Sequence, residues 1–222
     1  MKLSAITLAF AALMFTVPAC TQLDKPDDNS IETPENNGEQ PSNNGNGSDE
    51  ALKTLVIYYS YTGNCQQIVE SLIAQVAADV VRIQPADKTQ KYEANNYAIG
   101  TELLTAIKND PASADSYPAI DPVSTNLADY EAFIIVTPLW WSHMAAILQT
   151  YLFQNGAKLA GKPVGLIVSS HSSGISGVEA DAKRLVPDGK FYSESLWINN
   201  SNHSKRADLI TGWISKCNIK TK

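Results

Sequence analysis

The chain has 222 residues, 44% of them hydrophobic, and a formal net charge of −6. The charge comes from one segment, because residues 21–50 hold eight acidic residues and one lysine, whereas residues 51–222 hold 15 acidic and 15 basic residues. Residues 51–222 therefore carry no net formal charge. This gives no basic excess for nucleic acid, and its length suits a single hydrophobic core.

The N-terminus predicts an exported and lipidated protein. Residues 1–19 combine one early lysine, an apolar run too short for a comfortable membrane span, and small residues before Cys20, as in a cleaved signal peptide. The ending VPAC resembles a bacterial lipobox, in which cleavage leaves the cysteine as a lipidated N-terminus. Acyl chains on Cys20 would anchor the protein to a membrane of the bacterial envelope, on its periplasmic or cell-surface face. A plain secretory signal with an incidental cysteine is the alternative.

Residues 20–50 are expected to form a lipidated cysteine followed by a disordered acidic tether. They are rich in Asn, Gly, Pro and acidic residues and nearly free of large apolar ones, so they cannot bury enough surface to fold. The folded domain is expected to span residues 51–222.

Strand and helix patterns alternate along this domain. Strands are predicted at residues 54–59 (TLVIYY), 80–84, 132–137 (AFIIVT, stopped by Pro138), 163–169 and 191–198. Helices are predicted at residues 63–78, 92–109, 142–154, 175–185 and 205–217, and residues 110–129 are predicted to be mostly loop. This alternation predicts an α/β fold with a parallel sheet covered by helices on both faces, which binds ligands at the carboxyl ends of its strands.

Three strand-to-helix loops are expected to meet at that edge. The first, SYTGNC at residues 60–65, leads into a helix N-terminus, where backbone N–H groups and the hydroxyls of Ser60 and Thr62 favour an anion. It lacks the Gly-Lys-Ser/Thr ending of a nucleotide P-loop and the triple glycine of a dinucleotide fingerprint. A phosphate monoester therefore fits best.

The other two loops are TPLWWSHM at residues 137–144 and SSHSSGISG at residues 169–177. Trp140 and Trp141 follow Pro138, and they either belong to the core or provide a surface on which a flat ligand stacks. The third loop is made of small residues, so a ligand can approach the backbone closely at Gly174. A phosphate site, an aromatic wall and a small-residue wall together suggest flavin mononucleotide (FMN).

The segments YYSYTGNCQQI, DYEAFIIVTPLWWSHM and VSSHSSGISG, in this order and spacing, resemble the flavodoxin-like proteins across residues 53–217. The resemblance implies a three-layer, doubly wound, five-stranded parallel sheet in the order 2-1-3-4-5, with FMN at the switch between the first and third strands. The sequence departs from the family pattern at two positions. Cys65 replaces a residue with a hydroxyl group, and His143 stands where glycine or threonine is common. The residues implied to bind the cofactor are Ser60, Tyr61, Thr62, Gly63, Asn64, Cys65, Thr137, Pro138, Leu139, Trp140, Trp141, Ser142, Ser170, His171, Ser172, Ser173 and Gly174.

Three further residues invite other interpretations. Cys65 is interpreted as a space-filling replacement rather than a redox thiol, and no disulfide with Cys217 is expected because the two cysteines fall at opposite edges of the sheet. His171 stands among serines, but the sequence has no Gly-x-Ser-x-Gly elbow of a hydrolase, so it either bonds the flavin or lies in solvent. The histidines and acidic residues show no metal-ligand spacing, and no catalytic side chain is assigned.

The sequence thus predicts an FMN-binding, flavodoxin-like protein of the bacterial envelope, working in electron transfer or flavin-dependent reduction. Balanced charge disfavours electrostatic steering toward a protein partner, so an oxidoreductase acting on a quinone or another small acceptor is equally consistent with it. The alternative is a non-enzymatic lipoprotein that uses the fold to bind a ligand or a partner. The redox partner and the oligomeric state are not predicted.

Overall fold

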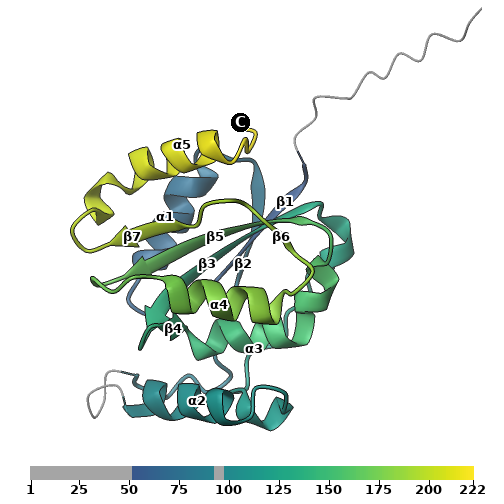
Figure 1. Ribbon diagram of the computed structural model, residues 1–222, viewed down its shortest axis with the longest axis vertical. Coiled ribbons are helices and arrows are strands. Elements are labelled where there is room, and N and C mark those ends of the chain that lie inside the picture. The colour runs from purple at the N-terminus through teal and green to yellow at the C-terminus, as the bar shows by residue number, and fades with distance from the viewer. Residues whose placement is uncertain (1–51, 93–97) are drawn as a thin grey trace, which may run out of the picture. The chain divides into compact units, whose positions relative to one another are not determined.

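The computed structural model describes residues 52–92 and 98–222 (Figure 1). The described residues belong to one compact unit. The expected signal peptide, Cys20 and the tether lie outside the described residues. Within the described ranges, no helix combines the length and the apolar character needed to cross a membrane.

The centre of the domain is a sheet whose main strands are all parallel. The strand order is β2-β1-β3-β5, and two short strands, β6 and β7, both pair with β5 at the far edge. A two-residue strand, β4, pairs antiparallel with the end of β3. The strands are β1 (Thr54–Tyr58), β2 (Ala78–Arg82), β3 (Ala132–Trp140), β4 (His143–Met144), β5 (Pro163–Ser170), β6 (Lys190–Phe191) and β7 (Leu196–Asn199). The predicted doubly wound parallel sheet is confirmed, with the fifth predicted strand split into β6 and β7.

Helices cover both faces of the sheet (Figure 1). Helices α1 (Asn64–Ile73) and α5 (Arg206–Lys216) lie on one face, and α3 (Ala146–Asn155) and α4 (Ser176–Leu185) lie on the other. Helix α2 (Ala98–Asn109) lies outside α3 rather than against the sheet. The described ranges also contain four short 3-10 helices: Ala114–Ser116, Leu127–Asp129, Gly156–Leu159 and His203–Lys205.

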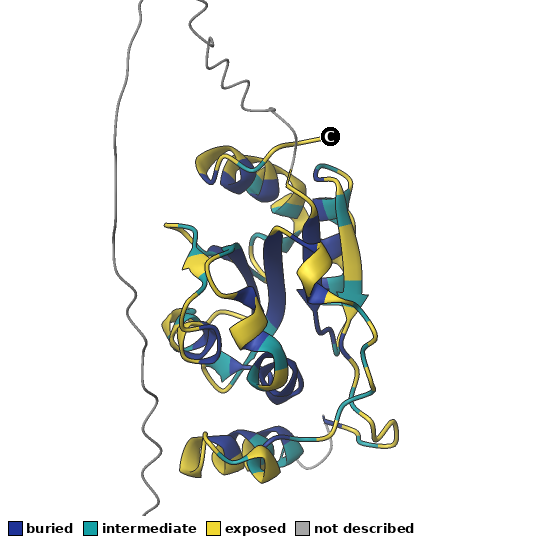
Figure 2. Ribbon diagram, turned by 90° about the vertical axis from the view of Figure 1, so that its right-hand side faces the viewer, coloured by how far each residue is buried: buried dark blue, intermediate teal, exposed yellow. Residues whose placement is uncertain are grey.

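The core consists of two apolar layers, one on each side of the sheet. Side chains alternate along a strand, so Val56 and Ile134 face α1 and α5 while Ile57 and Ile135 face α3 and α4. All four are at most 1% exposed, and burial of each such side chain contributes about 1.5–3 kcal/mol. Burial on both faces explains why these strands are continuous apolar runs. Figure 2 shows that this central layer is almost wholly buried.

The segment after β3 differs most from the prediction. Strand β3 does not stop at Pro138 but continues to Trp140, and the chain then folds back so that Trp140 pairs with His143. The predicted helix start at Ser142 is therefore wrong, since α3 begins only at Ala146. The reason is a tight two-residue turn at Trp141 and Ser142, whose φ angles of 47° and 70° lie in the left-handed region.

Other boundaries shift by a few residues. Helix α1 ends at Ile73 instead of residue 78, and β2 occupies residues 78–82 instead of 80–84. The described part of the second predicted helix is Ala98–Asn109, and residues 93–97 of that prediction lie outside the described residues. The segment expected to be mostly loop, residues 110–129, contains two short 3-10 helices and an isolated β-bridge between Ile120 and Pro85.

Candidate functional site

The three predicted loops meet at the carboxyl edge of the sheet and line one cavity of about 520 Å³, called here the loop cavity. Eleven predicted residues line it: Ser60, Tyr61, Thr62, Asn64, Cys65, Pro138, Leu139, Trp140, Trp141, Ser170 and His171. Four further lining residues were not predicted: Tyr92, Gly100, Ser169 and Asn200.

Six predicted residues lie near the loop cavity without lining it. Gly63 is the N-cap of α1, and Ser142 is in the hairpin turn. Thr137 is fully buried, and its hydroxyl donates to the Pro138 carbonyl at 3.0 Å. The remaining three are exposed residues of the third loop: Ser172, Ser173 and Gly174.

One end of the loop cavity is built to receive an anion. Gly63 has a φ of 90° and open space around the position of a Cβ, so the chain turns sharply into α1 at this point. The first intrahelical bond runs from the Gln67 N–H to the Gly63 carbonyl at 3.0 Å, and the Gln66 N–H donates to Ser60 Oγ at 3.2 Å. The N–H groups of Asn64 and Cys65, at the start of the helix, precede that bond and point outward with the positive end of the helix dipole.

The guanidinium of Arg82 is hydrogen-bonded to this loop, a contact that the sequence did not predict. Arg82, the last residue of β2, donates from Nη2 to the Ser60 carbonyl at 3.0 Å and from Nη1 to Gln66 Oε1 at 3.3 Å. Its guanidinium also lies 5.9 Å from the centre of the Tyr58 ring. A positive charge fixed on the backbone of an anion-binding loop strengthens that loop's field. The clue in the sequence is a basic residue at the end of the strand next to β1.

Cys65 is a packing residue at the base of the loop. It is 1% exposed, and burial raises the pKa of its thiol, whereas a hydrogen bond with Ser169 acts weakly in the opposite direction. A reactive cysteine needs a lowered pKa and access to solvent, and Cys65 has neither. Cys65 and Cys217 are both free and buried.

Aromatic rings form the opposite wall of the loop cavity. Trp140 meets Tyr59 edge to face at 5.7 Å between ring centres and lies 4.9 Å from Tyr92. Trp141, at the hairpin turn, is 52% exposed. Among the described residues, the buried Tyr92 hydroxyl has no hydrogen-bond partner, and burial raises the pKa of Tyr92 to about 12, so the hydroxyl stays protonated. This wall offers flat apolar surface and one spare donor.

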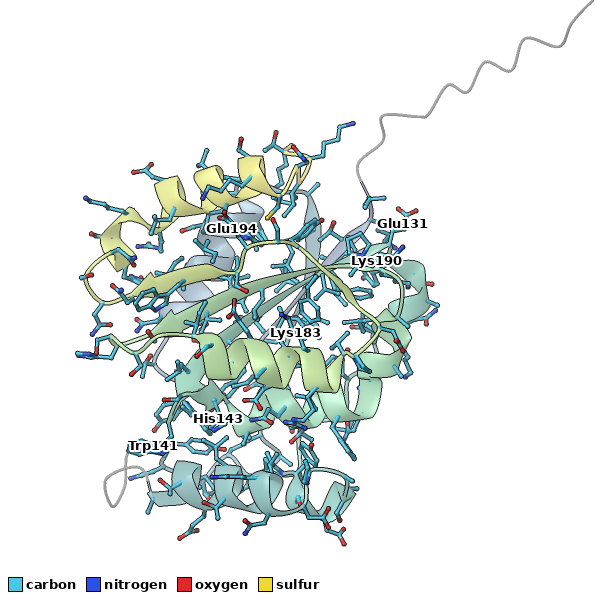
Figure 3. The ribbon with its side chains drawn as sticks, viewed as in Figure 1. Glu131, Trp141, His143, Lys183, Lys190 and Glu194 are labelled. Atoms are coloured by element: carbon cyan, nitrogen blue, oxygen red, sulfur yellow. The ribbon has the colours of Figure 1, made fainter. Side chains whose placement is uncertain are left out.

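The hairpin that carries the tryptophans is clamped to α4. A Cβ on Gly177 would lie 2.1 Å from the Ser142 carbonyl oxygen, so only glycine allows this close approach. One turn further along α4, Asp181 Oδ2 accepts from the Met144 N–H at 3.0 Å and lies 3.0 Å from His143 Nδ1. Figure 3 shows Trp141 and His143 together between α4 and α2.

His171 and its serine neighbours do not form a hydrolase site. The Ser170 hydroxyl donates to the Ser173 carbonyl at 2.9 Å and accepts from Trp197 Nε1 at 2.8 Å. His171 is exposed, and its Nδ1 lies 3.5 Å from the Ser172 hydroxyl. In the described ranges no carboxylate is hydrogen-bonded to His171, and the Ser172 contact, at 3.5 Å, is longer than the contact between a nucleophile and its base.

Known proteins share this fold. A model of the flavodoxin family matches residues 53–217. A protein of Bacteroides eggerthii classed as a flavoprotein is 28% identical, with a TM-score of 0.60, over 76% of this chain and 99% of that chain. A similar Bacteroides uniformis protein gives 24% identity and a TM-score of 0.58, over 73% and 99%. A Lactobacillus acidophilus flavoprotein, solved in complex with FMN, gives 16% identity and a TM-score of 0.55, over 71% and 99%.

Proposed function

This chain belongs to the flavodoxin family, and we propose that it binds FMN in the loop cavity and works in electron transfer or flavin-dependent reduction. The observation that carries the proposal is the junction of two unlike surfaces in one cavity of about 520 Å³. One end is a helix N-terminus that favours a phosphate, and the other is a wall of aromatic rings. FMN combines a phosphate monoester with a flat ring system.

The residues present fit both ends of FMN. The backbone N–H groups of Asn64 and Cys65, with the Thr62 hydroxyl and the charge of Arg82 on the Ser60 carbonyl, would hold the phosphate. Trp140 and Trp141 would border the ring, and the partnerless Tyr92 hydroxyl would supply a donor. The Lactobacillus relative of the same fold is in complex with FMN, which is consistent with this assignment.

FMN, when bound, supplies the electron chemistry, and the chain's own contribution is to bind and orient it. Balanced charge over residues 51–222 gives little electrostatic steering toward a charged protein. We therefore favour a small acceptor, such as a quinone, over a highly charged protein partner.

Binding is tested by titrating the purified protein with FMN and with riboflavin, following the flavin absorbance and fluorescence. FMN is expected to bind at micromolar concentration and riboflavin at least tenfold more weakly, because riboflavin lacks the phosphate. The variant Gly63→Ala places an alanine at a φ of 90° in the phosphate loop, and Gly161→Ala places one at a φ of 73° in a distant turn, both in open space. The two variants carry a similar backbone penalty of about 1–2 kcal/mol. Loss of FMN affinity in Gly161→Ala as large as in Gly63→Ala would contradict the assigned loop.

The expected site of action is the bacterial envelope, through lipidation of Cys20. The support is the VPAC sequence after an apolar run, followed by a polar segment long enough to separate the domain from a membrane. The Cys20→Ala variant is expected to lose lipid labelling and membrane association. Unchanged membrane association and processing in this variant would argue for a plain export signal or another anchor.

A further inference from the structure

A second cavity of about 410 Å³, called here the α2 cavity, lies beside the loop cavity. It is bounded by α2, α3, α4 and the β3–β4 hairpin, and Trp141 lines both cavities. Its lining consists of Thr101, Leu104, Thr105, Ile107, Lys108, Pro111, Trp141, His143, Gln149, Asp181 and Arg184. Apart from Trp141 and His143, which belong to the second loop, these residues are accounted for neither by the family resemblance nor by the loop cavity. The volume lies in the range of small-molecule sites.

Asp181, the one acidic group among the described lining residues, is already satisfied. Asp181 has an 11% exposed side chain, accepts from the Met144 N–H at 3.0 Å, and faces His143 Nδ1 at 3.0 Å and Arg184 Nη2 at 3.4 Å. Arg184 also donates to Gln149 Oε1 at 2.7 Å, and Gln149 is 1% exposed. The carboxylate therefore has little capacity to bind a cationic ligand.

Lys108 and His143 contribute polar groups that remain available. Among the described residues, neither the Lys108 ammonium nor His143 Nε2 has a hydrogen-bond partner. The described lining carries a net positive charge, because it contains two cationic side chains, Lys108 and Arg184, and one anionic side chain, Asp181. A ligand that uses these groups carries an anionic oxygen.

Apart from Thr101 and Thr105, the rest of the lining is apolar, and it includes a flat surface. Leu104 and Ile107 are buried side chains of α2, and Trp141 is 52% exposed at the cavity's edge. An exposed indole next to aliphatic side chains favours a planar ring.

The hairpin is held in a costly conformation at this point. Trp141 and Ser142 have φ angles of 47° and 70°, in the left-handed region that is unfavourable for residues other than glycine. Gly177 and Asp181 hold the turn against α4 and offset this cost. Backbone strain that the surrounding structure maintains is typical of ligand sites, and here its effect is to place Trp141 and His143 at the mouth of the cavity.

We propose that the α2 cavity binds a planar aromatic molecule bearing an anionic oxygen, with the ring against Trp141 and the oxygen near Lys108 and His143 Nε2. The inference does not depend on FMN binding, since none of its polar groups belongs to the phosphate loop. A ligand bound here lies next to the loop cavity, separated from it by the Trp141 side chain.

The proposal is tested with 2-hydroxy-1,4-naphthoquinone, which is an anion at neutral pH, and with the neutral 2-methyl-1,4-naphthoquinone. Each is titrated into the flavin-free protein while tryptophan fluorescence is recorded. The anion is expected to bind saturably below about 100 μM and about tenfold more tightly than the neutral compound, which is a difference of about 1.4 kcal/mol. Equal affinities, or no saturation of the anion up to 1 mM, would overturn the proposal.

Matched variants locate the site. Lys108→Met is expected to weaken the anion about fivefold to tenfold and leave the neutral compound unchanged, whereas Lys183→Met removes the same charge from an exposed position of α4 outside the lining. His143→Asn keeps a polar group near Asp181 and removes Nε2, so it is expected to weaken the anion at unchanged thermal stability. Equal effects of Lys108→Met and Lys183→Met would refute the site. Displacement of the probe by FMN would place the probe in the loop cavity and would refute it as well.

Discussion

Gly177→Ala tests whether the clamp between α4 and the hairpin is as tight as the structure indicates. The added Cβ would lie 2.1 Å from the Ser142 carbonyl oxygen and 3.2 Å from its carbon. An unstrained carbon–oxygen contact is about 3.3 Å or longer, so the helix or the hairpin must move by roughly 1 Å. The opposing atoms are backbone, so no side-chain rotation relieves the contact.

The expected cost follows from two opposing effects. Overpacking of this kind costs about 1–3 kcal/mol, and alanine in a helix gains up to about 1 kcal/mol over glycine. The net expectation is a loss of about 1–2 kcal/mol in the free energy of unfolding, or about 2–8 °C in Tm for a domain of this size. The same movement displaces Trp141 and His143, so FMN and the naphthoquinone anion are both expected to bind several-fold more weakly.

The matched control is Gly212→Ala in α5, where a Cβ meets nothing within 4 Å. This variant is expected to gain about 0.5–1 kcal/mol, because only the helix preference changes. Urea unfolding of the wild type and both variants measures the two effects, which should have opposite signs. Stabilisation of the protein by Gly177→Ala to the same extent as by Gly212→Ala would show that the hairpin is not clamped.

Three further predictions concern the site. Arg82→Gln is expected to weaken FMN about threefold to tenfold and leave riboflavin unchanged, because Arg82 acts on the phosphate loop through the Ser60 carbonyl; an equal loss for both flavins in parallel titrations would argue for a purely structural role. Burial raises the pKa of the Cys65 thiol, so its stabilising contribution is complete below about pH 8.5, the unfolded value, and falls by about 1.4 kcal/mol per pH unit above it. Cys65→Ala should flatten this decline in urea unfolding between pH 8.5 and 9.5, and an unchanged slope would show that the thiol ionises freely in the folded state. Asp181→Ala is expected to cost about 2–3 kcal/mol, because it leaves the Met144 N–H and Arg184 without their carboxylate; a loss below 0.5 kcal/mol would show that water replaces it.

The sheet and its edge could be predicted from sequence because local patterns determine them. Continuous apolar runs such as the one containing Ile134 and Ile135 reflect burial on both faces. Parallel strands then require crossovers, and crossovers bring the loops after β1, β3 and β5 to one edge. Eleven of the seventeen residues expected to bind the cofactor line the loop cavity for this reason.

The parts that could not be predicted depend on contacts between distant segments. The hairpin at Trp141 and Ser142 has no glycine or asparagine to indicate a left-handed turn, so its sequence gives no local signal. It exists because Gly177 and Asp181, some 35–40 residues later, hold it from α4. In the same way, Tyr92 and Asn200 reach the loop cavity through tertiary packing, and no motif near them indicates this position.

The same clamp gives a physical reason for His143 in place of a small residue. A hairpin of two strained residues needs a restraint at its far side, and Asp181 supplies it through the Met144 N–H and the His143 ring. Glycine and threonine have no ring nitrogen to place next to that carboxylate. With either of them at position 143, the partners of Asp181 would be Arg184 and the Met144 N–H. His143 therefore contributes to both cavities: its Nδ1 side helps to hold Trp141 at the loop cavity, and its Nε2 side faces the α2 cavity. This double role predicts that His143→Asn, which preserves only the first contact, separates the two binding activities, lowering affinity for the naphthoquinone anion while FMN affinity stays within twofold of the wild type.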